Sequence, residues 1–247
     1  MVTFRTRALA GAFARRLRAV DFFASVTLFG AALLISVLPF LILLSSLANH
    51  QIDTDISRHI GLERQGARIV SQLFRSSPSH SWAAIVTGLA FAAAGTAAVT
   101  SSLQVIYERI FGQPHRGWKD LFRFITWVGV LFGVLVTDSV ISGPARTAAT
   151  PIGVAAFFWW TMHFLLAGRV SWRFLLRPAI VTALLWIGLE LFSAVYFSGQ
   201  IVSDSRLYGP IGVVFTLMIW FIAIGAVIVL GAAAGATWAE RAGAAPR

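Results

Sequence analysis

Three ionisable side chains fall inside long apolar stretches, where such groups are rare and most often functional. Glu190, in "LLWIGLELF", lies near the middle of one stretch, where a carboxyl must be protonated, paired or hydrated. We expect it to face the interior of a helical bundle. Asp138, in "VTDSV", lies nearer the end of another stretch and could be hydrated. Both are candidates for substrate binding or gating, and hydrogen bonding between helices is the alternative. His163 is expected to hydrogen-bond a neighbouring helix or to lie near the headgroups.

No enzyme signature accompanies these residues. The sequence has no Walker A loop, no H-E-x-x-H and no G-x-S-x-G, and it has no cysteine. Its five histidines are scattered, without metal-ligand spacing in the polar segments. We therefore predict a protein that is not an enzyme and binds no cofactor or metal. Without a P-loop, transport would be passive, driven by an ion gradient or dependent on a partner.

The composition requires lipid around the chain. Of 247 residues, 57% are hydrophobic and only 12% are charged, and the mean hydropathy is +0.78. A soluble domain is about half apolar and a quarter charged, so its core could not hide this much apolar surface. The net charge of +10 favours basic loops facing anionic lipid headgroups over a nucleic-acid partner.

Six stretches are each long and apolar enough to cross a bilayer, which takes about 20 residues. They lie at residues 24–48, 82–103, 122–142, 152–168, 178–198 and 211–236. A basic segment, residues 1–23, is predicted to form an amphipathic helix in the membrane interface. The transmembrane domain then covers residues 24–238, and residues 239–247 form a short tail. The predicted fold is all-α: a polytopic integral membrane protein with about six transmembrane helices.

Lysine and arginine set the orientation, because they are enriched in cytoplasmic loops. With the N-terminus inside, 14 of the 20 basic residues fall in inner segments and 6 in outer ones. Both termini are therefore predicted to be cytoplasmic. The sizeable external piece is the loop at residues 49–81, in which residues 56–73 have apolar side chains at roughly helical spacing.

An elbow, "YGPIG", joins the last two stretches. Pro210 has no N–H, and Gly209 and Gly212 permit backbone angles that other residues resist. Irregular backbone at membrane depth is tolerated only inside protein or beside a cavity. The elbow is predicted to dip below the outer surface, with Tyr208 at the mouth of a cavity that leads toward Glu190. The alternative is a surface turn with Tyr208 in the aromatic belt.

Two further features concern helix geometry. Pro39 lies inside the first stretch and is expected to kink it, either as a static bend or as part of a gate. Small residues recur in the second stretch and in Gly231–Gly235 of the sixth. We expect them to let helix backbones approach closely.

Two segments near the C-terminus carry a family resemblance. They are "RVSWRFLLRPAIVTALLWIGLELFSAVYF" and "LYGPIGVVFTLMIWFIAIGAVIVLGA", and they resemble the YihY/BrkB family of bacterial inner-membrane proteins. The matching residues are Trp172, Arg173, Trp186, Glu190, Tyr208, Gly209, Gly212, Trp220, Gly231 and Ala232. In the N-terminal half, "SSLQVIYERIFG" is more loosely similar to that family's "LNRIYG" stretch. The chain departs from the pattern at Ala233, where a glutamate is expected, and at Glu108, near an expected asparagine.

The resemblance implies a multi-pass protein of the bacterial inner membrane, described as a transporter, with lipid-like substrates suggested for some members. We predict a transporter or lipid-translocating protein for an amphiphilic or anionic substrate. The alternative is a non-transporting scaffold in envelope assembly; the label ribonuclease BN, given to some members, finds no supporting site here. Expected partners are membrane lipids, and a second copy of the chain is a further candidate. The candidate substrate or gating residues are Glu190, Asp138, Tyr208, Gly209, Pro210, Gly212 and Pro39.

Overall fold

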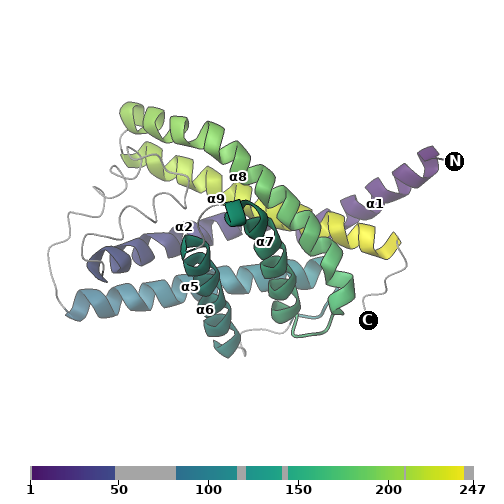
Figure 1. Ribbon diagram of the computed structural model, residues 1–247, viewed down its shortest axis with the longest axis horizontal. Coiled ribbons are helices and arrows are strands. Elements are labelled where there is room, and N and C mark those ends of the chain that lie inside the picture. The colour runs from purple at the N-terminus through teal and green to yellow at the C-terminus, as the bar shows by residue number, and fades with distance from the viewer. Residues whose placement is uncertain (1, 48–81, 116–120, 141–143, 209, 242–247) are drawn as a thin grey trace. The chain divides into compact units, whose positions relative to one another are not determined.

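The computed structural model describes residues 2–47, 82–115, 121–140, 144–208 and 210–241 (Figure 1). These ranges hold only helices and short turns, which confirms the all-α prediction for the described part of the chain. The helices are α1 (Val2–Val20), α2 (Phe22–Leu47), α5 (Trp82–Ile110), α6 (Leu121–Val140), α7 (Pro144–Leu165), α8 (Trp172–Tyr208) and α9 (Pro210–Arg241). A helix therefore covers most of each of the six apolar stretches.

Two helical segments of the described chain, Trp172–Ser193 and Val214–Arg241, are long and apolar enough to cross a membrane. A bent pair, Gly11–Val20 and Phe22–Ser36, makes a third if the pair is one span. These lengths fit a membrane protein, because a span needs about 20 mostly apolar residues. Six spans and cytoplasmic termini stay predictions.

Two helices begin well before the apolar stretches that they contain. The fourth and fifth stretches begin at residues 152 and 178, whereas α7 begins at Pro144 and α8 at Trp172. Pro151 and Pro178 thus lie inside helices. The backbone carbonyl of Ser171 accepts the N–H groups of Phe174 and Leu175, at 3.1 and 3.2 Å, and so starts α8 almost two turns before the proline.

The described helices form two compact units. The first comprises residues 1–29, 100–187 and 224–247, and the second comprises residues 30–99 and 188–223. The core of the first unit is built from side chains with at most 1% exposure, among them Tyr107, Met162, Leu166, Phe174 and Val229. The second unit brings α2 and α5 close together, because a Cβ built on Gly95 would lie 2.6 Å from the Cα of Ser36.

The basic segment at the N-terminus is helical, as predicted, and it meets α2 at a bend of 49°. The bend falls at Asp21, whose φ of 52° is left-handed. The Asp21 N–H bonds to the carbonyl of Arg18 at 3.0 Å, and the carbonyl of Asp21 accepts the N–H of Ser25 at 2.9 Å. Aspartate tolerates this conformation better than most residues. That α1 lies in the membrane interface stays a prediction.

Close contact between α8 and α9 depends on two glycines. A Cβ on Gly231 would lie 2.6 Å from the Cα of Thr182, and one on Gly235 would lie 2.3 Å from the Cα of Pro178. Real Cβ atoms do not approach a backbone this closely, so the two helices touch where a side chain is missing. This confirms the expectation for Gly231–Gly235, and the same pattern holds at Gly95 in α5.

Gly235→Ala is expected to destabilise the protein, because the new methyl group must push α9 away from the backbone of α8. The cost should be about 1–3 kcal/mol, as for other overpacked interiors. Thermal unfolding in detergent measures it. Gly129→Ala on α6 is the matched control, since nothing lies within 4 Å of a Cβ there. Equal melting temperatures for the two variants would contradict the close approach.

Candidate functional site

A carboxylate is buried in the last turn of α5. The side chain of Glu108 is 2% exposed and lies beyond the apolar stretch that ends at residue 103. Its Oε1 accepts hydrogen bonds from Gln104 Nε2 at 3.1 Å and from Arg169 Nη2 at 2.7 Å. Its Oε2 lies 2.8 Å from His115 Nδ1. We call Glu108, Arg169, His115 and Gln104 the Glu108 cluster.

Two helix ends bring the Glu108 cluster together. Helix α5 ends at a left-handed glycine, Gly112, with φ of 63°. The N–H of Gln113 then bonds to the carbonyl of Glu108 at 2.8 Å, and that of Gly112 to the carbonyl of Arg109 at 3.4 Å. This is a Schellman ending, which turns the chain back so that His115 reaches the carboxylate.

Helix α7 ends in the same way. Ala167 and Gly168 are both left-handed, with φ of 57° and 71°. The Gly168 N–H bonds to the carbonyl of His163, and the Ala167 N–H to the carbonyl of Phe164, both at 3.1 Å. The turn places Arg169 directly after the helix, where its guanidinium can reach α5.

The Arg169 guanidinium connects three chain segments. Besides its bond to Glu108, Nη1 donates to the carbonyl of Pro114 at 2.7 Å and Nε donates to the carbonyl of Leu166 at 3.0 Å. The planar fork of arginine suits such divided bonding, which the single ammonium of lysine could not reproduce. The Glu108 cluster therefore links α5, the turn after it and the end of α7 by hydrogen bonds.

Burial alone would raise the pKa of the Glu108 carboxyl. The three hydrogen bonds and the positive charge of Arg169 outweigh burial and hold this pKa below its ordinary value of 4.5. Glu108 is therefore ionised at neutral pH. The neighbouring Tyr107 is fully buried, burial raises its pKa, and its hydroxyl has no hydrogen-bond partner among the described residues.

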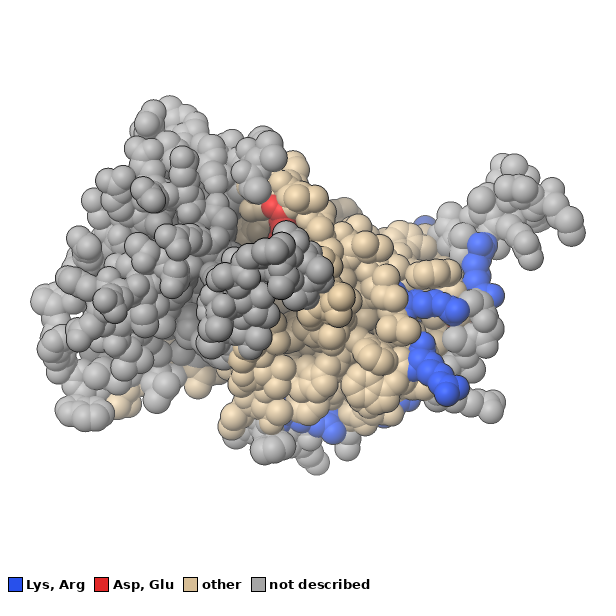
Figure 2. All heavy atoms as spheres, viewed as in Figure 1, with Lys and Arg blue, Asp and Glu red and all other residues tan. Residues whose placement is uncertain are grey.

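Further arginines join helix ends around the Glu108 cluster. Arg16 of α1 donates to the backbone carbonyl of Ile110 and pairs with Glu240 of α9. Arg177 of α8 donates to the carbonyl of Ala239 at 3.2 Å. Helix α1, the end of α5, the start of α8 with the turn before it, and the end of α9 thus meet at one end of the first unit, where arginine side chains gather (Figure 2). The exposed ones are Arg15, Arg18, Arg109, Arg173 and Arg241.

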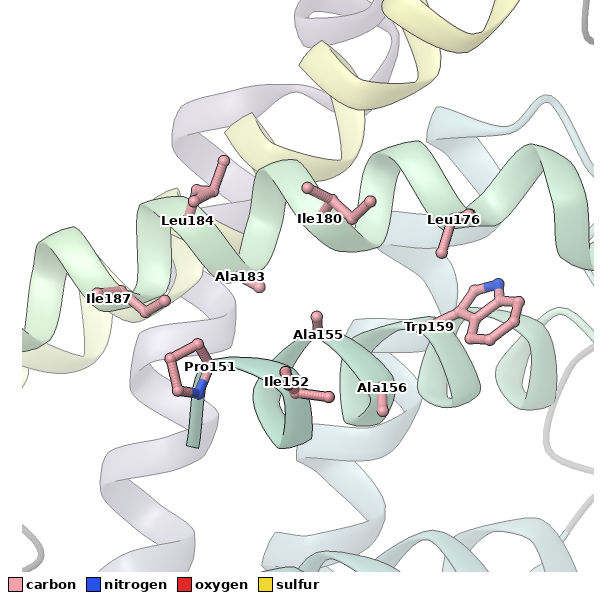
Figure 3. Close-up of a pocket in the computed structure, with 10 residues that line it drawn as sticks. All are labelled: Pro151, Ile152, Ala155, Ala156, Trp159, Leu176, Ile180, Ala183, Leu184 and Ile187. Atoms are coloured by element: carbon pink, nitrogen blue, oxygen red, sulfur yellow. The ribbon is translucent and has the colours of Figure 1, made fainter. Parts of the chain in front are cut away.

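An apolar groove runs between α7 and α8 in the first unit (Figure 3). Its volume is about 380 Å³ and it is open on one side. The hollow exists because the short side chains of Ala155, Ala156 and Ala183 lie among larger apolar ones. The lining residues are Pro151, Ile152, Ala155, Ala156, Trp159, Leu176, Ile180, Ala183, Leu184 and Ile187.

One end of the groove is fixed by aromatic contacts. Trp159 donates its indole N–H to the carbonyl of Trp172 at 2.8 Å, and the two rings meet edge to face at 5.0 Å. His163 stacks on the Trp172 ring at 3.9 Å, and its Nδ1 donates to the carbonyl of Val170 at 3.1 Å. The hydrogen bond expected from His163 to a neighbouring helix is thus made instead to the turn that follows its own helix.

The candidate residues from the sequence do not form one site in the described structure. Glu190 of α8 is exposed, although it has an interaction partner, and this differs from the expected inward-facing carboxyl. Its neighbours Leu191 and Phe192 are also exposed, so little described protein surrounds this part of α8. Gly212 is buried in α9.

The other candidates are only partly described. Helix α8 continues to Tyr208, ten residues past its predicted end, and α9 begins at Pro210, where a missing N–H costs little. Pro39 and Asp138 lie in α2 and α6. The side chains of these four residues, Gly209 and the predicted external helix at residues 56–73 all lie outside the described part of the chain.

The Glu108 cluster and the groove were not predicted from the sequence. Glu108 had been noted only as a departure from a family pattern. A signal was present, because a carboxylate in the last turn of a helix opposes the helix dipole and needs a cationic partner. For the groove, the signal was the two apolar stripes with alanines at helical spacing, at residues 151–159 and 176–187.

Comparison with known proteins shows which family the chain belongs to. A family model described as Virulence factor BrkB matches residues 16–247, nearly the whole chain. No curated protein and no solved structure matches the chain significantly.

Arg169→Met is expected to be strongly destabilising, because it leaves the Glu108 carboxylate buried without its charge partner. Breaking a buried ion pair on one side costs about 3–5 kcal/mol. Arg18→Met, at an exposed arginine of α1, is the control. The double variant Glu108→Leu/Arg169→Met should recover much of the loss in the free energy of unfolding. If Arg169→Met has the same free energy of unfolding as Arg18→Met, the ion pair contributes nothing to stability.

Acidic pH should lower the stability of the folded protein, because it protonates Glu108. Its folded pKa lies below the ordinary value of 4.5, so its contribution to stability is complete above that pH and disappears as the pH falls below it. Melting temperatures measured across this range should converge for the parent protein and Glu108→Gln. At neutral pH the variant should melt lower. A constant gap down to the lowest pH would mean that another group carries the acid dependence.

Proposed function

Because the chain belongs to the Virulence factor BrkB family, we propose that it is a multi-pass protein of the bacterial inner membrane that binds an amphiphilic, anionic substrate and moves it across the bilayer. The observation that carries the proposal is the groove between α7 and α8. A groove of 300–1,000 Å³ with an apolar lining is typical of a small-molecule site. Here it lies along Trp172–Ser193, a segment able to span the membrane.

The chemistry of the groove lining supports movement of an amphiphile rather than of a small ion. An ion path needs polar groups along its length, whereas the lining of this groove is almost wholly aliphatic and aromatic. An amphiphile keeps its apolar part in such a groove and its polar part in water. Arg173, an exposed arginine three residues before Leu176 of the groove lining, would attract an anionic polar group.

The arginine contacts that join helix ends support the proposed topology. Arg16, Arg169 and Arg177 link the N-terminal helix, the turn after α5, the α7–α8 turn and the end of α9. Segments joined in this way lie on one side of a membrane. We place that side in the cytoplasm, because basic residues are retained there.

A scaffold function in envelope assembly is the second candidate. The Glu108 cluster favours it, because the cluster holds three segments rigidly and none of its groups faces the groove lining. A scaffold needs stable helix ends and no substrate path. Measurement of lipid movement separates the two functions.

Ala156→Trp should slow lipid movement at least tenfold, because the indole would fill a groove of about 380 Å³. The assay follows fluorescent phosphatidylglycerol in proteoliposomes, where an external reductant quenches only the outer leaflet. Ile125→Trp, on an exposed part of α6 outside the groove, is the matched control and should keep the parent rate. Parent protein no faster than empty vesicles would reject transport of this lipid and favour the scaffold.

A further inference from the structure

The groove has the length of one lipid leaflet. Along α8 its lining runs from Leu176 to Ile187, and eleven residues of helix rise about 16 Å. Half of the hydrocarbon core of a bilayer is about 15 Å. An extended acyl chain that enters at one end would therefore reach the other end at the bilayer midplane. A compact apolar molecule would leave most of this length empty.

The two ends of the groove differ in chemistry. The end at Ile187 and Pro151 has only apolar lining (Figure 3). The opposite end, at Leu176 and Trp159, abuts Trp172, whose ring is 40% exposed. Tryptophan is enriched at the membrane–water interface, because its ring is apolar and its N–H is polar. The polar part of a bound amphiphile therefore belongs at the Trp172 end.

Arg173 occupies the position next to this end. It lies three residues before Leu176 on α8, and residues three apart share a helix face. Side chains lean toward the N-terminus of their helix, so that of Arg173 extends beyond the end of the groove rather than into it. Arg173 is exposed.

The neighbouring arginines are already engaged. Arg169 pairs with Glu108, and Arg177 donates to the carbonyl of Ala239 while it stacks over the Trp238 ring at 5.5 Å. Arg173 has no comparable partner among the described residues. A guanidinium can bind two oxygens of a phosphate at once, and it stays charged at every relevant pH.

We propose that the α7–α8 groove is a binding site for an anionic glycerophospholipid, with one acyl chain along Ala155, Ala156 and Ala183 and its phosphate on Arg173. The inference rests on the proposed function in one respect: it takes the groove to face lipid. The site discriminates between headgroups, because phosphatidylglycerol has a net negative charge and phosphatidylcholine has none. The phosphate alone would gain no apolar contact, so free glycerol phosphate should bind far more weakly.

The test measures thermal stabilisation of the full chain in a mild detergent by dioctanoyl phosphatidylglycerol. A ligand that binds only the folded state stabilises it by RT ln(1 + L/Kd), where L is the ligand concentration, so the melting temperature begins to rise when L passes Kd. We expect stabilisation by this lipid that follows this concentration dependence, less by dioctanoyl phosphatidylcholine and none by glycerol phosphate. Arg173→Gln should weaken the affinity for phosphatidylglycerol roughly tenfold, as for loss of a charge-assisted bond. It should weaken that for phosphatidylcholine less, because the choline ammonium already opposes the attraction of that lipid to a guanidinium.

Two controls separate the site from general effects. Arg18→Gln removes an exposed arginine of α1 and should leave both affinities unchanged. Ala156→Trp should abolish stabilisation by both lipids, whereas Ile125→Trp should not. Equal affinities for the two lipids, or equal losses in Arg173→Gln and Arg18→Gln, would overturn the headgroup assignment. If lipid still stabilises the Ala156→Trp variant, the groove is not the binding site.

Failure of this inference can be told apart from failure of the proposed function. Binding is measured without lipid movement, so a selective site in a protein that moves no lipid would leave the inference intact and reject transport. Lipid movement that is unaffected by Arg173→Gln, with no selective stabilisation, would support transport by another path and reject this site.

Discussion

A carboxylate buried in an apolar fold must be compensated, and this constraint shapes one whole end of the molecule. Glu108 is 2% exposed, so water cannot solvate it. Its compensation comes from Arg169, 61 residues away, which can reach it only because α5 and α7 both end in left-handed turns. The two helix ends are thus not independent loops. Their backbone conformations, the guanidinium and the carboxylate form one arrangement, in which each part requires the others.

Helix α8 has a different use for each of its faces. On one face, Pro178 and Thr182 touch glycines of α9, which leaves no space between the two backbones. On another, Leu176, Ile180 and Leu184 face α7 across a groove that stays open. The positions of small residues explain both the close packing and the open groove on this helix. A glycine facing another backbone lets the two helices approach, whereas alanines among larger side chains leave an unfilled space between helices.

The helices could be predicted from the sequence because they depend on local interactions. Contacts between residues far apart in the chain could not. Each apolar stretch became a helix, because a backbone in lipid must satisfy its own hydrogen bonds. The apolar stretch at residues 178–198 did not show where its helix begins, because α8 starts in the more polar segment after Ser171. The partner of Glu108 and the meeting of the α7 and α8 stripes depend on tertiary contacts. The spacing of Ala155, Ala156 and Ala183 was visible, but not which helix would face them.

The left-handed residue between α1 and α2 limits which amino acids can stand there. With φ of 52°, position 21 suits aspartate, asparagine or glycine, and a β-branched residue would be strained. Without the 49° bend the two helices would join into one rod from Val2 to Leu47, about 69 Å long. A bilayer with its headgroups is about 40–45 Å thick. A straightened rod would therefore be longer than a bilayer is thick. The backbone angle at residue 21 thus sets the direction in which the arginines of α1 leave the axis of α2.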